Sequence, residues 1–433
     1  MKRLIDYINN NVLFKVASLN SALVLIRIIS GFLTSKAIAI FIGPEGMALI
    51  GNLRNFMTSV HSFAILGLYN GVVKYVSEFK NDTKELSKTI SSVYYLGFIA
   101  TTIVAFFCYF NAEYLNTIIF EGYNYTYVFK IIALALPFYS LNMLSFSIIN
   151  GFSKYKILLV INIIGQVLGL FITLILIWQN NIDGALVSVV ITPSVVFLIT
   201  LVGIINRKNL TSLINIESVN ISTIKKLSAF SVMALVTAII LPLVSIAVRN
   251  YIIDNVGMKE AGFWEAMNRI SNYYLMFVNS LLALYILPRF SEIDSVKEFR
   301  KEVFDFYKTI MPVFGMGLLV IFLLKRFIIS IVFSNEFKPM EELFGWYLLG
   351  DFVKVLSVVI AYQFLAKRMF WHYIITEIFS VSIIYFTSIY FVDLYGVKGA
   401  TIAHFVSYVM YFAVILLIFS SSLFGVIPEE DKE

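Results

Sequence analysis

The chain has 433 residues, of which 59% are hydrophobic and only 14% are charged, and its formal net charge is +6. Charged residues make up about 25% of an ordinary soluble protein, so this composition excludes a chain surrounded mainly by water. It predicts a polytopic membrane protein. The positive charge is spread over many loops and therefore does not indicate a nucleic-acid partner. The single cysteine, Cys108, excludes an intrachain disulfide and a cysteine-based metal site.

Apolar runs that cross about 30 Å of hydrocarbon need roughly 20 residues each, and the first half of the chain contains a series of them. The first run contains Arg27 and is much longer than the core of a signal peptide, so we interpret it as a retained span. The second follows the turn Gly43-Pro44. These runs lie at about 14–41, 46–73, 88–110, 126–150, 155–178 and 183–205.

A similar series occupies the second half, at about 226–252, 261–288, 306–333, 342–366, 370–392 and 397–421. Short polar segments separate the runs, among them Arg207-Lys208-Asn209 between the two series. The sequence therefore predicts an all-α membrane protein with twelve transmembrane helices and short connections.

Basic residues in the loops orient the predicted spans, because Lys and Arg near span ends are retained on the cytoplasmic side. One set of alternate loops is rich in Lys and Arg, whereas the first three loops of the other set contain neither. Only Lys259 and Lys338 appear in later loops of that second set. Both termini are therefore predicted to be cytoplasmic, which agrees with an even number of spans.

The two halves of the chain also share a residue pattern. Gly46 and Asn52 recur 216 positions later as Gly262 and Asn268, and Gly184-Ala185 recurs 215 positions later. Six plus six spans of equal orientation form a parallel internal repeat, an arrangement typical of alternating-access transporters. We expect two lobes, an N-terminal one at residues 1–210 and a C-terminal one at 211–433, with a substrate cavity between them.

Two arginines lie inside predicted spans of the first half, where a basic residue at the helix centre costs roughly 2.5 to 3.5 kcal/mol on insertion scales. Arg27 lies about 13 residues into the first span, or roughly 20 Å along the helix, which is deep in the bilayer. Arg54 shares one side of the second span with Thr58 and His61. No acidic residue lies within one turn of either arginine. Both are therefore expected to face a polar cavity.

The second half carries charges of both signs. One face of the span at 261–288 contains Glu265, Asn268 and Arg269. Later spans add Asp351, Lys354 and Glu377. The pairs Glu265 with Arg269 and Asp351 with Lys354 stand at helical spacing, so they either line the cavity or neutralise each other locally.

A further lysine and a further arginine each have two open interpretations, and the histidines have a structural one. Lys36 and Arg249 lie nearer the outer ends of their spans and either face the cavity or extend toward the membrane surface. His61, His372 and His404 are interpreted as hydrogen-bonded packing residues. Unpaired cations in a membrane cavity indicate an anionic ligand, and the planar guanidinium group suits phosphate oxygens particularly well.

Four sequence blocks carry a resemblance to a known family. In chain order they are "FIGPEGMALIGNLRNF" (41–56), "LYNGVVKYVSEF" (68–79), "LSAFSVMALVTAIILP" (227–242) and "FGWYLLGDFVKV" (344–355). With these blocks, nearly the whole chain resembles the Wzx-type O-antigen and enterobacterial lipid III flippases. These are polysaccharide transporters of the multidrug/oligosaccharidyl-lipid/polysaccharide (MOP) exporter superfamily, whose fold is shared by the drug-exporting MATE branch.

The resemblance implies that an undecaprenyl-diphosphate-linked oligosaccharide moves from the cytoplasmic to the periplasmic leaflet of the inner membrane, with no cofactor and no resident metal. Membrane lipid surrounds the protein, and a polysaccharide polymerase and a chain-length regulator are further candidate partners. Residues that match the family pattern are Arg27, Lys36, Arg54, Lys74, Arg249, Lys354, Asp351 and Glu377. Glu265 and Arg269 depart from the pattern expected in the lipid III branch, where this face is polar but uncharged.

A mechanism follows as a hypothesis. Arg27 and Arg54 bind the diphosphate, and Arg249 or Lys354 completes the positive charge from the second lobe, with Lys36 and Arg269 as further substrate-binding candidates. Ion binding at Asp351 or Glu377, with Glu265 as a third candidate, loosens the pairing with Lys354 and changes the affinity of the cavity between states.

Two other functions are weighed against this one. A multidrug or cation antiporter of the same superfamily is disfavoured because the excess of basic residues repels cationic cargo. An integral-membrane glycan polymerase, ligase or glycosyltransferase needs a clustered acid and base or a sizeable extramembrane loop, and the longest loops, at about 111–125 and 206–225, provide neither. No P-loop motif appears, which disfavours direct ATP drive.

Overall fold

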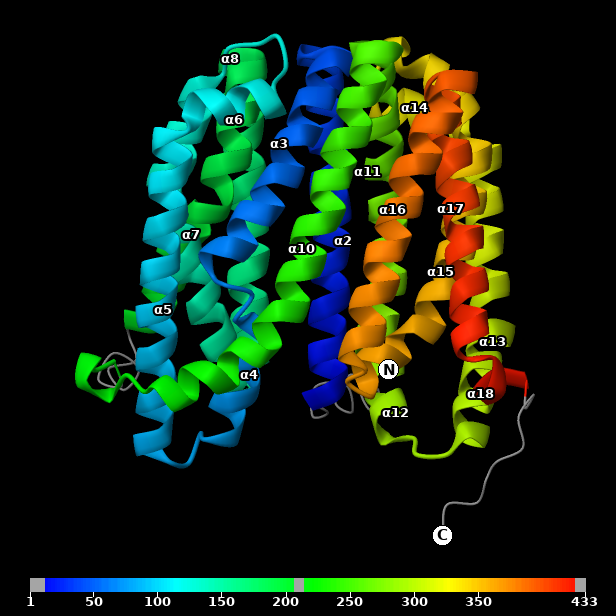
Figure 1. Ribbon diagram of the computed structural model, residues 1–433. Coiled ribbons are helices and arrows are strands. Elements are labelled where there is room, and N and C mark those ends of the chain that lie inside the picture. The colour runs from blue at the N-terminus through cyan, green and yellow to red at the C-terminus, as the bar shows by residue number, and fades with distance from the viewer. Residues whose placement is uncertain (1–11, 206–213, 425–433) are drawn as a thin grey trace, which may run out of the picture. The chain divides into compact units, whose positions relative to one another are not determined.

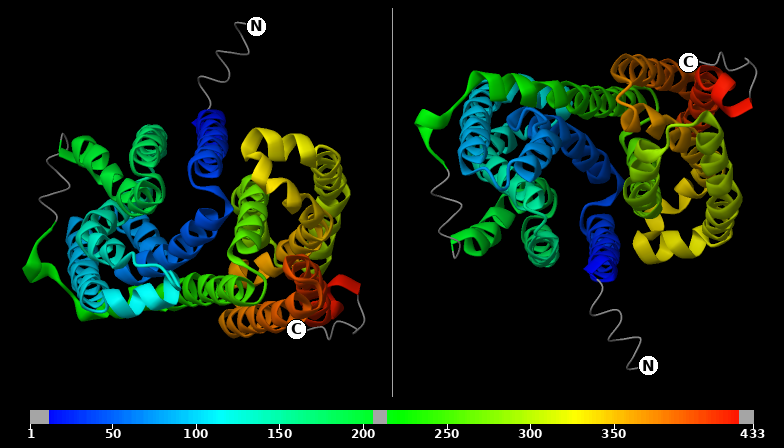
Figure 2. Two further views of the ribbon diagram at one scale, coloured as in Figure 1. Left: turned by 90° about the horizontal axis from the view of Figure 1, so that it is seen from above. Right: turned by 90° about the horizontal axis from the view of Figure 1, so that it is seen from below.

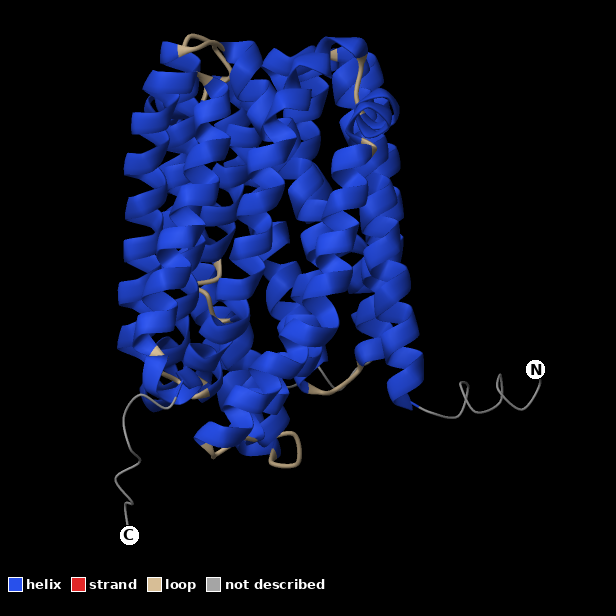
Figure 3. Ribbon diagram, turned by 90° about the vertical axis from the view of Figure 1, so that its right-hand side faces the viewer, coloured by secondary structure: helices blue, strands red, loops and turns tan. Residues whose placement is uncertain are grey.

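A computed structural model describes residues 12–205 and 214–424, and within these ranges the chain forms helices joined by short turns, with no strand (Figures 1 and 3). The helices up to residue 205 are α2 (Val12–Phe41), α3 (Gly43–Ala64), α4 (Tyr69–Glu78), α5 (Thr83–Phe110), α6 (Ala112–Ile119), α7 (Thr126–Gly151) and α8 (Tyr155–Ile205).

After residue 213 the helices are η1 (Ile216–Ser218), α10 (Ile221–Asn255), α11 (Met258–Leu281), η2 (Leu282–Ile286), α12 (Leu287–Glu292), α13 (Val296–Leu323), α14 (Lys325–Val332), η3 (Asn335–Leu343), α15 (Phe344–Ala366), α16 (Phe370–Tyr395), α17 (Val397–Ile418) and α18 (Ser420–Phe424). The predicted break at Arg207-Lys208-Asn209 and the predicted lobe boundary after residue 210 lie outside the described residues.

Eleven stretches of the described chain are long and apolar enough to cross a membrane. One of them, α8, has 51 residues and would measure about 77 Å as a single straight helix, far more than the hydrocarbon thickness. Its backbone is non-helical at Asn180 and Asn181, where φ is −129° and +46°. The two arms of α8 therefore act as separate spans, and the stretches correspond in order to the predicted runs.

Two predicted runs prove to be interrupted. The run at 46–73 is divided between α3 and α4 by a turn in which Leu66 and Gly67 have positive φ angles of 52° and 61°. The run at 306–333 is divided between α13 and α14 at Leu324. Helix α13 also begins ten residues before that run, at Val296, because the Ser295 hydroxyl caps its first turn by accepting a hydrogen bond from the Glu298 backbone N–H.

By packing, the chain divides into two units, each of which we describe by itself. The first unit comprises residues up to Ile42 together with Leu49–Ile246, and the second comprises Gly43–Ala48 together with the residues from Ala247 onward. Most of α10 thus belongs to the first unit, whereas its last turns belong to the second.

The internal repeat extends to whole elements. Helices α5 and α13 both have 28 residues, and α6 and α14, which follow them, both have eight. A polar pair repeats as well: Thr173 and Thr192 lie 3.5 Å apart in α8, and Thr387 and Ser407 lie 2.8 Å apart between α16 and α17. The same succession of helices and contacts is therefore built twice from one chain.

The repeated glycines have a steric reason. A Cβ atom added at Gly184 would lie 1.8 Å from the carbonyl oxygen of Leu176, and one added at Gly399 would lie 1.8 Å from the carbonyl oxygen of Phe391. Each glycine therefore allows the backbone to pass close to the end of the preceding span. In both halves the glycine follows the residue with this carbonyl by eight positions, which indicates that both turns have the same geometry.

Each unit has its own apolar core. In the first unit, Leu227 of α10 joins a cluster formed by α4, α5 and α7. In the second unit, a larger cluster joins α11, α13, α15 and α17. These cores fix the helices that carry the charged residues described below.

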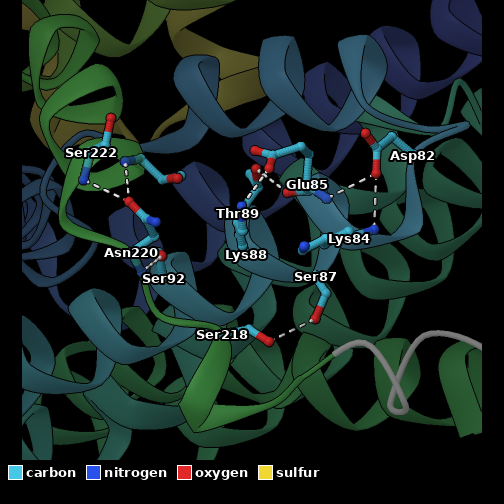
Figure 4. A network of polar contacts seen from close by, with 11 residues as sticks. Asp82, Lys84, Glu85, Ser87, Lys88, Thr89, Ser92, Ser218, Asn220 and Ser222 are labelled. Atoms are coloured by element: carbon cyan, nitrogen blue, oxygen red, sulfur yellow. Dashed lines mark hydrogen bonds and ion pairs between the residues drawn. The ribbon is translucent and has the colours of Figure 1, made fainter.

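Residues 215–220, just before α10, are hydrogen-bonded to serine side chains of α5 (Figure 4). The Ser91 hydroxyl accepts a hydrogen bond from the Asn215 backbone N–H at 2.9 Å, and the Ser92 hydroxyl accepts one from the Asn220 N–H at 3.1 Å. The Ser87 and Ser218 hydroxyls lie 3.4 Å apart. These bonds place the beginning of α10 on the first unit.

A proline inside α10 is compensated by a serine of α3. Pro242 has no backbone N–H, so the carbonyl of Ala238, four residues earlier, loses its hydrogen bond within the helix. The Ser59 hydroxyl donates a hydrogen bond to this carbonyl at 3.1 Å. In a membrane, where water does not reach the backbone, this side chain satisfies the carbonyl that the proline leaves open.

We expect Ser59→Ala to lower the free energy of unfolding by about 1 kcal/mol, because the Ala238 carbonyl then has no donor. In a Pro242→Ala background, Ser59→Ala should lower the free energy of unfolding by less, since the backbone N–H of residue 242 can then donate to the Ala238 carbonyl. Thermal unfolding of the purified protein in detergent measures this double-mutant cycle.

The control is Ser245→Ala, because the Ser245 hydroxyl bonds only to the Leu241 carbonyl of its own helix. Equal costs of Ser59→Ala in the two backgrounds would show that Ser59 does not compensate the proline.

Candidate functional site

Three buried charges meet in the second unit. Arg249 of α10 donates from Nη2 to Oε2 of Glu265 at 2.6 Å, and Arg269 donates from Nε to Oε1 of the same carboxylate at 3.1 Å. The three residues are only 1%, 6% and 3% exposed, in the order Arg249, Glu265 and Arg269. The Arg249 guanidinium also lies over the ring of Trp264, 5.2 Å from its centroid. We call these three residues the arginine–glutamate triad.

The triad bears on the interpretation of Arg249 and of the Glu265–Arg269 pair. Arg249 does not extend to the membrane surface, because it is buried against a carboxylate and an indole ring. Glu265 and Arg269 do form an ion pair at i, i+4. Two guanidinium groups share one carboxylate, so the triad keeps one excess positive charge. Within the described residues, Nη1 and Nη2 of Arg269 have no hydrogen-bond partner.

A second polar cluster surrounds Asp351 of α15, which is fully buried. Its Oδ2 accepts hydrogen bonds from the Ser271 hydroxyl at 2.5 Å and from the Tyr274 hydroxyl, both on α11. Its Oδ1 lies 3.0 Å from Nε2 of His404 on α17. Both carboxylate oxygens are thus occupied, and three helices are joined through one side chain.

Aromatic residues enclose this carboxylate cluster. The Tyr347 ring stacks on His404 with centroids 4.2 Å apart, and its hydroxyl donates to Oδ1 of Asn268. The Tyr408 ring meets His404 edge-on at 4.9 Å. The imidazole ring is therefore held in place from two sides.

The predicted pairing of Asp351 with Lys354 has no counterpart in the described part of the chain, where these two side chains form no ion pair within 4.0 Å. The Lys354 ammonium instead lies 5.3 Å from the centroid of the Tyr408 ring. The hydrogen bonds to Asp351 come from side chains of α11 and α17. Lys354 nevertheless interacts electrostatically with both Asp351 and Glu377, which is half-buried on α16.

The candidate residues of the first unit lie on α2 and α3. Arg27 is exposed on α2, and its side chain has no hydrogen bond or ion pair with any described residue. Lys36 and Arg54 are half-buried. His61, on the same face as Arg54, stacks on Tyr139 with ring centroids 3.5 Å apart, as expected for a packing residue. The roles of the three basic residues stay predictions.

Sequence reasoning did not find the partners of Asp351. His404 was expected to be a hydrogen-bonded packing residue, and its partner proves to be a buried carboxylate 53 positions away. Ser271 and Tyr274 lie about 80 positions from Asp351 and carry no local signal. Among the described residues, no group of three His, Cys, Asp or Glu side chains could hold a metal ion.

The fold resembles that of known membrane transporters. A MATE-family multidrug transporter of the MOP superfamily in an inward-facing conformation is 12% identical, with a TM-score of 0.77, over 92% of this chain and 98% of that one. The lipid II flippase MurJ in an inward closed conformation is 16% identical, with a TM-score of 0.71, over 94% and 87%. The predicted helical MOP transporter fold is therefore confirmed.

Sequence comparison places the chain more narrowly. The family model described as "Polysaccharide biosynthesis protein" matches residues 13–294, and the chain belongs to this family. The lipid III flippases of Escherichia coli K12 and Shigella flexneri are each 27% identical over 403 residues, which cover 93% of this chain and 96% of theirs. The expected resemblance to polysaccharide transporters is therefore confirmed.

We expect Glu265→Gln to destabilise the protein by about 3 to 5 kcal/mol, because it leaves two buried guanidinium groups without a counter-charge. The amount of folded protein in membranes and the thermal unfolding in detergent both measure this loss.

Glu341→Gln is the matched control, because Glu341 also pairs with two basic residues, Lys325 and Arg326, but at the exposed surface. Glu341→Gln should lower the stability of the protein only slightly. Equal behaviour of the two variants would contradict the role of the triad as a buried charge balance.

Proposed function

We propose that this chain translocates undecaprenyl-diphosphate-linked oligosaccharide repeat units from the cytoplasmic to the periplasmic leaflet of the bacterial inner membrane. The observation that carries the proposal is the similarity to two lipid III flippases over 93% of the chain. The protein is thus a multi-pass transporter and not an enzyme, with both termini in the cytoplasm. A polysaccharide polymerase and a chain-length regulator act on the exported units as its partners.

The charges of the spans suit a diphosphate ligand. Residues 20–64 contain Arg27, Lys36 and Arg54 but a single acid, Glu45, in the first turn of α3. Arginine binds phosphate oxygens through two parallel N–H donors, and a low-dielectric surrounding strengthens such contacts. Arg27 and Arg54 bind the diphosphate in this proposal, and Lys36 contributes further positive charge.

In the second unit, the candidates differ in how available they are to a substrate. Lys354 is half-buried and forms no ion pair among the described residues, so its ammonium is the more accessible cation. Arg249 is engaged by Glu265 and Trp264. We therefore assign Lys354 to substrate binding, with Arg269 as the second candidate through its two open nitrogens, and assign Arg249 to the charge balance of the triad.

Export of a cationic drug is the alternative. The similarity to a MATE transporter concerns the fold alone, and its identity is 12%. A drug exporter needs acidic residues where its cargo binds, whereas the mid-span charges of α2 and α3 are basic. Efflux of a cationic dye that disappears on deletion of the gene would favour this alternative.

We expect the double substitution Arg27→Ala with Arg54→Ala to abolish polysaccharide export and to leave membrane insertion intact, because the diphosphate loses its two guanidinium partners. The measurement is the accumulation of undecaprenyl-linked glycan facing the cytoplasm, together with the amount of protein in the inner membrane.

Arg326→Ala is the control, since Arg326 is an arginine with an 83% exposed side chain that pairs with Glu341 at the surface. The Arg326→Ala variant should export polysaccharide normally. Normal export by the double variant would refute the binding role of the two arginines.

A further inference from the structure

We infer that a groove between α13 and α15 of the second unit binds the isoprenoid chain of the lipid-linked substrate. The inference rests on the proposed function and deepens it, because it gives a binding site to the lipid part of a substrate whose diphosphate is bound elsewhere. Three observations support it: a residue motif that occurs in both helices, a packing that keeps these helices apart, and a lining that is apolar throughout.

The two helices carry the same residue pattern. Residues 315–322 of α13 read "GMGLLVIF", and residues 345–352 of α15 read "GWYLLGDF". Both stretches thus have glycine, leucine, leucine and phenylalanine at positions i, i+3, i+4 and i+7, which lie on one face of a helix. These eight residues are the ones that line the groove. The groove is therefore built from one motif that is used twice.

The two copies of the motif lie against each other in opposite directions. A Cβ atom added at Gly315 would lie 3.1 Å from a ring carbon of Phe352, and one added at Gly345 would lie 3.8 Å from a ring carbon of Phe322. The beginning of each motif therefore faces the end of the other, as in a pair of antiparallel helices.

The leucines of the two copies also occupy matching places. Leu318 and Leu348 are 6% and 5% exposed, whereas Leu319 and Leu349 are 50% and 51% exposed. Each helix thus contributes one leucine to the floor of the groove and one to its rim. The half-exposed rim shows that the groove opens to the outside of the unit.

The glycine of α15 keeps the space between the helices open. Where glycine lets two stretches of backbone approach, as at Gly184 and Gly399, an added Cβ would lie within 2 Å of a backbone oxygen. At Gly345 an added Cβ would make only an ordinary contact with a ring. Packing therefore does not require this glycine, although glycine weakens a helix relative to alanine. Its effect is to leave room.

The size and the lining of the groove suit a hydrocarbon chain. Its volume is about 440 Å³, within the range of about 300 to 1,000 Å³ that small-molecule sites have. Leucine and phenylalanine side chains offer no hydrogen bond, so sugar hydroxyls and water would lose theirs in this space. The motif extends over seven residue steps, or about 10 Å along each helix. The groove therefore holds part of a chain, and the remainder stays in lipid.

The methyl branches of an isoprenoid decide between the apolar chains that a membrane offers. An isoprenoid carries one branch in each five-carbon unit, so it presents bulky groups at regular intervals. A groove whose floor and rim alternate between leucine and phenylalanine, with a glycine at each end, matches such a chain better than a straight acyl chain. We therefore take the isoprenoid chain of the substrate as its occupant.

The place of the groove along the spans suits the end of translocation. Residues 315–322 belong to the last part of α13, and residues 345–352 belong to the first part of α15. In the orientation that the loop charges predict, both of these helix ends lie at the periplasmic side. The groove would therefore receive the chain in the periplasmic leaflet, after the headgroup has crossed the membrane.

Photo-crosslinking in nanodiscs tests the groove directly. The purified protein is embedded in phosphatidylethanolamine and phosphatidylglycerol together with an undecaprenyl phosphate that carries a diazirine in its chain. We expect the label in the peptides that contain residues 315–322 and 345–352. An excess of unlabelled undecaprenyl phosphate should reduce this labelling at least several-fold, whereas an equal excess of phosphatidylglycerol should leave it unchanged.

Gly345→Phe should reduce the labelling several-fold, because the added ring occupies the groove. Gly317→Phe is the matched control, since Gly317 lies on α13 outside the groove and an added Cβ there meets no described atom within 4 Å. Labelling of this control should equal that of the wild type.

A second pair of variants changes polarity instead of size. Leu349→Gln places an amide at the rim of the groove and should also weaken the labelling several-fold. Leu323→Gln is its control, because Leu323 is an exposed leucine at the end of α13 that does not line the groove.

Three results would overturn the inference. Equal competition by phosphatidylglycerol would identify the groove as a surface for ordinary membrane lipid. No label in the two peptides would leave a second copy of the chain as the occupant. Labelling that is unchanged in both Gly345→Phe and Leu349→Gln would show that the chain lies elsewhere.

Transport in proteoliposomes separates this inference from the proposed function. A fluorescent undecaprenyl-diphosphate glycan is reconstituted, and its movement between leaflets is followed. We expect the wild type and Gly317→Phe to move it at equal rates and Gly345→Phe to move it several-fold more slowly. Movement by Gly345→Phe at the wild-type rate would contradict the inference and leave the flippase function intact. Absence of movement in the wild type would refute the proposed function, and the labelling would then still decide whether the groove binds an isoprenoid.

Discussion

Most of this structure depends on one constraint: inside a bilayer, every polar or charged group must find its partner within the protein, because water is absent. The arginine–glutamate triad meets this constraint in part, with three charges from two helices, while Nη1 and Nη2 of Arg269 have no hydrogen-bond partner among the described residues. The Asp351 cluster meets it with donors from α11 and α17. The same rule acts on the backbone, where Ser59 satisfies the carbonyl that Pro242 leaves open. Charges that cost several kcal/mol in isolation are thereby retained, and they fix the relative positions of the helices that carry them.

The internal repeat duplicates the backbone but not the charges. Helices of equal length recur, as do the close backbone approach at Gly184 and Gly399 and the hydroxyl pairs between neighbouring spans. Glu265 and Arg269, however, correspond at the spacing of the repeat to Leu49 and Leu53, which are apolar and buried. The duplicated part is the part that packing requires, whereas the arginine–glutamate triad and the Asp351 cluster are formed by residues of the second unit.

Much of the fold could be read from the sequence, because a bilayer imposes length and polarity on each span. The runs agreed in order with the helices, and the two arms of α8 were predicted as the separate runs 155–178 and 183–205. The break at Leu66-Gly67 was missed because the residues around it are as apolar as the spans themselves, whereas the break at Leu324 was missed although Lys325 and Arg326 follow it directly. Hydropathy reports whether a segment enters the membrane, but it does not report where the helix is interrupted within it.

The sequence by itself determined the class of protein and the order of the spans, and it indicated the repeat and the charged residues inside the apolar runs. Only the tertiary structure decided how those charges are paired. Glu265 with Arg269 could be foreseen, since residues four apart share a helix face. The contacts of Arg249 with Glu265 and of Asp351 with His404 join different helices, and their partners are chosen by helix packing. Spacing along one helix is a local property, whereas partners on neighbouring helices depend on how the whole unit packs.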